Sequence, residues 1–270
     1  MQSLESLLNS LNITLKVLVE TMPGAFVTYN SIRKKSSHIE LASSSGIISK
    51  KKKRSQEKTL YEFLSLAVWS ELLSRYSEVN DLQFRAPRPV GLSEVNSDKP
   101  NLFMEFLNGY ELKKLNALKR KTPVEIRDLK YPIPLYPACA LHLGALNRIK
   151  EVEGLFHADY DSRHVIFSPV GNVSVGVVDV ENSRVEDSEK VSGESEKLIK
   201  EFEKVTSSPK DLEVLKTWYS QGVESLIIPD SISQLDQVVE QVEKTYDLAF
   251  DFRNMKINNH MIRMPNVSFS

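Results

Sequence analysis

The chain has 270 residues, of which 35 are Lys or Arg and 36 are Asp or Glu, and it contains a single cysteine. This length allows one large domain or two lobes, while the formal net charge of −1 argues against bulk attraction to nucleic acids or anionic membranes. Cys139 alone forms neither an intramolecular disulfide nor a cysteine-based zinc site. Because no secretory signal and no apolar stretch of ~20 residues is present, we expect a cytoplasmic protein without a membrane span.

The first fifty residues change from a helical to a strand pattern. Leucines three and four positions apart predict an amphipathic helix over residues 3–20, which packs on the body of the protein or binds a partner. Residues 25–49 alternate or are β-branched and predict three short antiparallel strands, the last ending in GIIS. A run of five basic residues over 50–54 follows directly.

A mostly apolar helix is predicted over residues 57–76, and its apolar residues wrap more than one face, which indicates burial on two sides. Pro87 and Pro89 break the helical pattern and predict an extended segment. Residues 102–107 form an apolar run that predicts a strand ending at Asn108-Gly109.

Helical patterns dominate the second half of the chain. One strand is predicted over residues 173–179, and the last twenty residues are expected to be irregular or extended. A strand-rich first third followed by a helix-rich remainder predicts an α+β fold. The predicted helices cover, in chain order, residues 137–150, 193–205, 210–221 and 231–248.

Polar residues cluster between an apolar helix and an apolar strand. The cluster consists of His157, Asp159, Asp161, Arg163 and His164. Asp179 ends the next strand, and carboxylates that face each other from a loop and a strand end could hold a divalent cation. The alternative is a loop of solvated charges.

Four stretches, in this order, resemble the protein-kinase-like superfamily, especially small divergent members such as the RIO kinases and the lipopolysaccharide kinases. RAPRPVGL occupies the place of a proline-containing segment, and NLFMEFLNGYELKKL is similar to the kinase hinge. The helix and catalytic loop of these families are similar to the stretch LHLGALNRIKEVEGLFHADYDSRHVIF. The strand and metal-binding Asp that follow are similar to VGVVDVENSR. The resemblance, over roughly residues 25–225, implies a two-lobed fold: a small antiparallel-sheet N-lobe over 24–107 and a mainly helical C-lobe over 108–270, preceded by the helix in 1–23.

The resemblance also implies a function, namely ATP- and Mg²⁺-dependent transfer of the γ-phosphate to a hydroxyl, with Mn²⁺ as an alternative metal. Asp159 would orient the attacking hydroxyl and Asp179 would bind the metal, while His157 would hold the loop. The hinge would read the adenine base and the residue after it would reach the ribose. These nucleotide-binding positions are Met104, Glu105, Phe106 and Leu107 for the base and Glu111 for the ribose.

The N-lobe should supply a lysine to the phosphates and a glutamate that holds it. Lys50 is the preferred lysine because it follows the strand GIIS, and Lys51 or Lys52 would fit a shifted register. Glu71 is the preferred partner, since it continues the helical row of apolar residues that includes Leu64, whereas Glu62 is the competing choice.

Two features depart from the kinase pattern. His164 stands where the catalytic loop normally has a metal-binding Asn, and imidazole suits transition metals better than Mg²⁺. Residues 31–37 contain no glycine where a phosphate-binding loop is expected.

These departures leave three alternatives open beside an atypical Ser/Thr protein kinase: a pseudokinase that binds a nucleotide or a protein, a small-molecule or lipopolysaccharide-type kinase, and an unrelated α+β protein. A protein acceptor is favoured over a sugar or lipid, but the sequence identifies no acceptor.

Overall fold

The computed structural model describes residues 39–41, 46–51, 55–93, 100–113, 135–168, 173–204, 209–229 and 233–257. The predicted helix over 3–20, the first of the three predicted strands and the glycine-free segment 31–37 lie outside these residues. Among the described residues, no helix is long and apolar enough to cross a membrane.

The first sheet is antiparallel and has the strand order β1-β2-β5-β4. Its strands are β1 (Ile39–Leu41), β2 (Ile47–Lys51), β4 (Pro89–Ser93) and β5 (Asn101–Glu105). β2 lies between β1 and β5, with Lys50 opposite Leu102 and Ile48 opposite Met104. The predicted strands over GIIS and 102–107 are thereby confirmed, and the structure shows that they are neighbours in one sheet.

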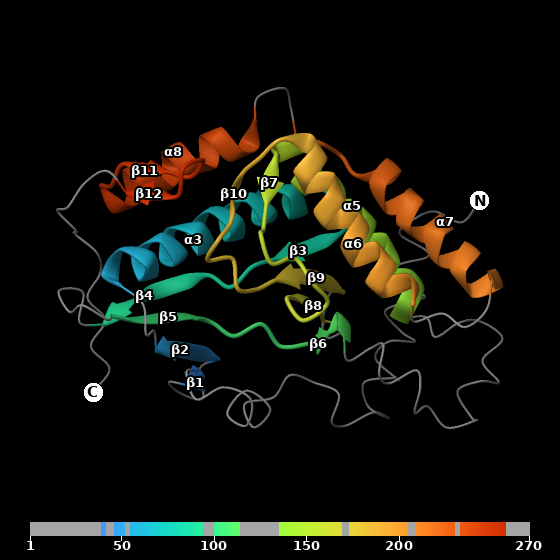
Figure 1. Ribbon diagram of the computed structural model, residues 1–270, viewed down its shortest axis with the longest axis horizontal. Coiled ribbons are helices and arrows are strands. Elements are labelled where there is room, and N and C mark those ends of the chain that lie inside the picture. Colours follow the sequence, from blue (N-terminus) through green and yellow to red (C-terminus); the bar gives the residue numbers. More distant parts are fainter. Residues whose placement is uncertain are drawn as a thin grey trace.

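Helix α3 (Gln56–Val79) joins this sheet to the rest of the molecule. It lies against β4 and β5, and α8 (Gln234–Tyr246) lies along its other side (Figure 1). Phe63 and Trp69 are fully buried, because apolar residues occur on several faces of the helix. The prediction of a helix buried on two sides is confirmed.

The second sheet has the strand order β3-β9-β8-β6, with β3 parallel to β9 and the other pairs antiparallel. β9 is buried along its whole length, as expected for a central strand rich in valine. The strands are β3 (Gln83–Arg85), β6 (Tyr110–Glu111), β8 (Val165–Ser168) and β9 (Ser174–Val177).

Besides α8, three helices lie in the second half of the described chain (Figure 1). They are α5 (Leu135–Glu153), α6 (Ser188–Glu203) and α7 (Pro209–Ser225). α5 and α7 pack closely at two glycines: an added Cβ would lie 2.1 Å from the Tyr219 carbonyl oxygen at Gly144 and 2.0 Å from the Leu141 carbonyl oxygen at Gly222. All three helices were predicted, although α6 begins five residues before the predicted start.

Two short antiparallel pairings occur among the described residues outside these sheets: β7 (Leu155–Phe156) with β10 (Arg184–Val185), which are distant in the chain, and β11 (Phe250–Asp251) with β12 (Lys256–Ile257). The second one begins the segment expected to be irregular or extended, and it packs against α3 through Tyr61, whose ring lies 5.3 Å from that of Phe250. The fold class is α+β, with small sheets and a mainly helical second half, as predicted.

Candidate functional site

The Lys50 side chain on β2 contacts carboxylates from two segments that are distant from it in the sequence. Its Nζ donates to Glu62 Oε1 of α3 at 2.8 Å and to Asp179 Oδ1 after β9 at 2.5 Å. Glu181 Oε2 lies 3.5 Å from the same nitrogen. Burial by itself would lower the pKa of Lys50, but Glu62 and Asp179 raise that pKa above its ordinary value of 10.5. The lysine therefore stays charged.

The prediction that Glu71 is the partner of Lys50 is wrong. Glu62, the competing choice, forms the ion pair and is buried, with only 1% of its side chain exposed. Glu71 instead accepts from Arg75 Nε at 3.2 Å on the outer side of α3. Nine positions separate the two glutamates, which is roughly half a turn beyond two full turns, so they lie on opposite faces of the helix.

His157 fixes the backbone of the predicted catalytic loop. The Asp159 N–H donates to His157 Nδ1 at 3.3 Å, which places the ring proton on Nε2, and Nε2 donates to the Val178 carbonyl at 3.0 Å. Burial, with Lys150 nearby, lowers the pKa of His157 to about 4, so the ring is neutral. The loop and the segment leading to Asp179 are thus tied together by one imidazole.

A buried ion pair below the loop was not predicted. Lys150 Nζ of α5 donates to Glu194 Oε2 of α6 at 2.7 Å, and the His157 N–H donates to the same oxygen at 3.0 Å. The ammonium also lies 3.3 Å from the centroid of the Tyr160 ring. No sequence signal marked this pair, because its two residues are 44 positions apart on different helices.

Two residues of the site have left-handed backbone conformations. Ala158, between His157 and Asp159, has φ 71°, and Asp179 has φ 62°. Such a conformation costs an L-residue about 1–2 kcal/mol, and here it turns the chain at the loop and at the end of β9. Strain of this kind concentrates at functional sites.

Asp159, His164 and Asp179 converge at the open side of the site. His164 Nδ1 lies 2.7 Å from the Asp159 carbonyl oxygen and 3.6 Å from Asp159 Oδ2. His164 Nε2 lies 3.7 Å from Asp179 Oδ2. The Asp159 side chain is 53% exposed and is accessible from solvent. The structure therefore brings Lys50 together with Asp159, His164 and Asp179, although Lys50 is far from these three in the sequence.

The donor atoms of this site suit a divalent cation. Two groups of carboxylate and imidazole ligands have donor atoms within 4.8 Å of one another: Asp159, Asp161 and His164 form the first, and Glu62, Asp179 and Glu181 the second. Carboxylate oxygens are ligands for Mg²⁺ and Mn²⁺, and imidazole favours later transition metals. Sequence reasoning missed Glu181, although its place two residues after Asp179 was a signal that could have identified it.

A small apolar cluster lies apart from the main core, between the predicted hinge and the strand that leads to Asp179. Leu107 and Ile166 are buried in it, and Phe106 and Val178 are partly buried against them. Both partly buried side chains leave apolar surface accessible. The cluster has the composition of a surface on which a planar aromatic base could pack.

The other predicted nucleotide-binding residues lie near this cluster in the fold. Met104 is buried on β5, and Glu111 on β6 pairs in register with Ile166. The Glu105 side chain accepts from Arg85 at 2.7 Å, and the Phe106 N–H donates to the Gly46 carbonyl at 2.7 Å. These hydrogen bonds hold the predicted hinge against β3 and against Gly46, which directly precedes β2.

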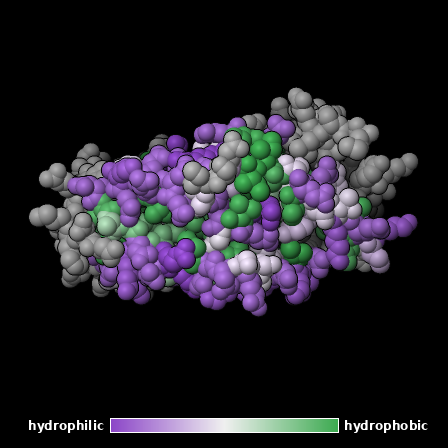
Figure 2. Space-filling view, turned by 90° about the horizontal axis from the view of Figure 1, so that it is seen from above, coloured by the Kyte–Doolittle hydropathy of each residue, from purple (hydrophilic) through white to green (hydrophobic). Residues whose placement is uncertain are grey.

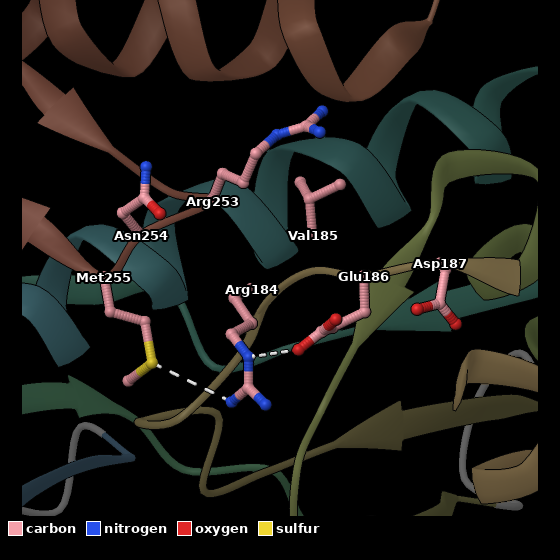
Figure 3. Close-up of a pocket in the computed structure, with 7 residues that line it drawn as sticks. All are labelled: Arg184, Val185, Glu186, Asp187, Arg253, Asn254 and Met255. Atoms are coloured by element: carbon pink, nitrogen blue, oxygen red, sulfur yellow. Dashed lines mark hydrogen bonds and ion pairs between the residues drawn. The ribbon is translucent and has the colours of Figure 1, made fainter. Parts of the chain in front are cut away.

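A separate open cavity of about 530 Å³ contains none of the predicted site residues (Figure 3). Arg184 extends into it, donates to Glu186 at 2.8 Å and lies 4.9 Å from the centroid of the Phe156 ring. Apart from this cavity, the surface of the face seen in Figure 2 is mostly hydrophilic, and an apolar patch lies near the centre of that face. The cavity lining is Arg184, Val185, Glu186, Asp187, Arg253, Asn254 and Met255.

Comparisons with known proteins add little to this geometry. No family model matches the chain, and no curated protein matches it. Among solved structures, one described as "WaaP in complex with acyl carrier protein" matches with a TM-score of 0.39 and 10% identity, over 80% of this chain and 90% of that chain. A likeness of this size carries no argument, so any functional assignment depends on the residues of the site.

Proposed function

We propose that this protein is a kinase-like phosphotransferase that uses ATP and a divalent cation to phosphorylate a hydroxyl group. One observation carries the proposal: Lys50 Nζ, from the first sheet, donates hydrogen bonds both to Glu62 of α3 and to Asp179, which follows β9 of the second sheet. Phosphoryl transfer requires positioned cations and carboxylates more than covalent catalysis. A partly buried lysine held by a buried glutamate and facing an aspartate meets that requirement.

Each residue of the site has a role that its surroundings support. Lys50 would contact phosphate oxygens, with Glu62 fixing the direction of its side chain. A divalent cation held by Asp179 would neutralise charge that develops on the phosphates. Asp159, half exposed and fixed through its backbone by His157 and His164, would orient the acceptor hydroxyl and take its proton.

The nucleotide base would pack on the apolar cluster of Phe106, Leu107, Ile166 and Val178. Val178 lies directly before Asp179, so a base on this cluster would place its phosphates toward the metal-binding carboxylate. Glu111, opposite Ile166, would then lie near the ribose. The acceptor is a hydroxyl of a protein, sugar or lipid, and we favour a protein.

Activity is tested with the purified full chain, labelled ATP and either Mg²⁺ or Mn²⁺, by following ADP release and phosphate incorporation. We expect Asp159→Asn to lower turnover at least about 10²-fold, the usual loss when a catalytic proton acceptor is removed, while ATP binding persists. Asp81→Asn, on an exposed residue after α3, is the matched control and should behave as the wild type.

The same experiment separates the proposal from its alternatives. If ATP raises the melting temperature but neither Mg²⁺ nor Mn²⁺ supports turnover, the chain is a nucleotide-binding pseudokinase. Unchanged turnover in Asp159→Asn would contradict the catalytic role of Asp159. If millimolar ATP has no effect on the melting temperature, the nucleotide site itself is wrong.

A further inference from the structure

Tyr61 lies directly before Glu62 on α3 and packs against the hairpin formed by β11 and β12. It is buried, with only 3% of its surface exposed. The ring lies 5.3 Å from the ring of Phe250, and it stacks on Phe252 at 6.4 Å with an interplanar angle of 11°. Because rings packed in this way cannot rotate freely, the Tyr61 hydroxyl has a fixed direction.

The Tyr61 hydroxyl ties α3 to the chain segment that follows Asp179. It donates to the Ser183 carbonyl at 2.5 Å, and the Phe252 carbonyl lies 3.4 Å from the same hydroxyl. Burial raises the pKa of the phenol, so the group keeps the proton that it donates. Ser183 is fully buried, and its N–H donates to the Val180 carbonyl at 3.1 Å, which closes a tight turn directly after Asp179.

Another contact between α3 and this turn passes through Lys50. Its Nζ donates both to Glu62 of α3 and to Asp179 at the start of the turn. Glu62 directly follows Tyr61, and Asp179 lies four residues before Ser183. The ionic contact and the tyrosine hydrogen bond therefore both fix the separation of the same two carboxylates.

The proposed reaction opens the ionic contact and leaves the tyrosine hydrogen bond in place. When nucleotide phosphates bind Lys50 and a cation binds Asp179, each of these groups has a new partner and the two separate. The Tyr61 hydroxyl involves neither group. We propose that Tyr61 is a positioning residue that keeps Glu62 and Asp179 at a fixed separation once a nucleotide has replaced the contact between Lys50 and Asp179. The inference rests on the proposed function, because it concerns the nucleotide-bound state of the same site.

Tyr76 offers a matched control on the same helix, about four turns further along α3. It is fully buried, and its hydroxyl donates to Glu153 at 2.6 Å. Tyr61→Phe and Tyr76→Phe each remove one buried hydroxyl and its hydrogen bond, so both should lower the melting temperature. Only Tyr61→Phe removes a contact to the turn after Asp179.

The first measurement requires no nucleotide. Urea denaturation of the full chain gives the unfolding equilibrium constants of Lys50→Met, Tyr61→Phe and the double variant. Each contact holds the two segments at the distance that the other contact requires, so the two should strengthen each other. We expect the unfolding constant of the double variant to be at least about threefold lower than the product of the single effects gives. Lys50→Met combined with Tyr76→Phe should show no such coupling.

The second measurement follows ADP release at saturating ATP. Tyr61→Phe should lower kcat at least about tenfold, because small displacements of catalytic groups are costly. The KM for ATP should change less than kcat, since Lys50 and the cation still bind the phosphates. Tyr76→Phe should keep kcat within about twofold of the wild type. A general loss of stability would affect both variants, so the difference between them reports positioning.

The outcomes separate this inference from the function on which it rests. Additive effects of Lys50→Met and Tyr61→Phe would overturn the inference and leave the phosphotransferase intact. A wild-type kcat in Tyr61→Phe, or equal losses of kcat in Tyr61→Phe and Tyr76→Phe, would also overturn it. If the wild-type chain releases no ADP and ATP does not raise its melting temperature, the proposed function fails, and the inference fails with it even where the coupling is found.

Discussion

The site contains several carboxylates around the positively charged ammonium group of one lysine, Lys50. Lys50 Nζ is surrounded by the carboxylates of Glu62, Asp179 and Glu181, with side chains 1%, 36% and 10% exposed. Because Glu62 is buried and Asp179 is accessible to solvent, the two carboxylates are suited to different roles toward Lys50. Glu62 is suited to hold the lysine in place, while the more exposed Asp179 is the carboxylate that solvent and another cation reach more easily.

At the residue scale we predict that Glu62→Gln and Glu71→Gln have opposite outcomes. Glu62→Gln removes the buried partner of Lys50, so turnover should fall about 10²-fold, as when one electrostatic group of an active site is removed. Glu71→Gln removes only the exposed pair with Arg75 and should leave turnover within about twofold. ATP turnover measured on both variants checks this. Equal losses would show that Glu62 does not position Lys50.

At the element scale, the loop depends on how the helices below it pack. α5 supplies Lys150, and α7 holds α5 in place through the close approach at Gly144 and Gly222. Tyr160 of the loop donates to Asn147 of α5 at 2.9 Å, and Asn147 donates to Tyr219 of α7 at 3.0 Å. Displacement of α7 would therefore reach the loop that contains Tyr160 through two hydrogen bonds.

We predict that Gly222→Ala destabilises the fold by about 1–3 kcal/mol, the usual cost of overpacking. The added Cβ would lie 2.0 Å from the Leu141 carbonyl oxygen, which cannot move without shifting α5. Gly193→Ala on α6 is the control, since its Cβ would meet nothing within 4 Å and alanine is favoured in helices by roughly 0.5–1 kcal/mol. Urea denaturation of the two variants should give opposite signs, and equal stabilities would contradict the close packing.

At the scale of the whole molecule, the core contains two neutral histidines. Burial lowers the pKa of both His142 and His157 to about 4. His142 Nδ1 lies 2.8 Å from the Ala138 carbonyl within α5, and His157 joins the loop to the second sheet. Protonating either one places a charge in the interior, so the fold as a whole responds to acid.

We predict that the free energy of unfolding falls steeply between pH 6.5 and pH 4. The folded pKa values lie below the unfolded value, so the unfolded chain binds more protons in this window and is favoured as the pH drops. From pH 7 to pH 5 each histidine should contribute a loss of roughly 2 kcal/mol, at about 1.4 kcal/mol per pH unit below 6.5. Chemical denaturation at several pH values measures the slope, and His142→Gln should reduce it by about half. A slope unchanged by that substitution would contradict the assignment.

Most of the fold was predictable because its signals are local. The strands around GIIS and residues 102–107 and the long helix between them follow from short-range alternation and apolar periodicity. The order of the HADYDSRH and VVDVE segments also marked Asp159, His164 and Asp179 as neighbours. The paired β11 and β12 were less evident, since two-residue strands carry almost no periodic pattern.

The sequence by itself determined the long helices, the strands around GIIS and residues 102–107 and the α+β class, since each depends on residues close together in the chain. The candidate lysine and aspartates came from the family resemblance of short stretches. Only the tertiary structure decided that Glu62 rather than Glu71 holds Lys50. α3 is apolar on several faces, so periodicity could not show which face meets the sheet. The tertiary structure also brought Lys150 and Glu194 together as an ion pair and placed the His164 ring opposite the Asp179 carboxylate. These contacts join segments whose relative placement is determined by packing of the whole core, which no local pattern encodes.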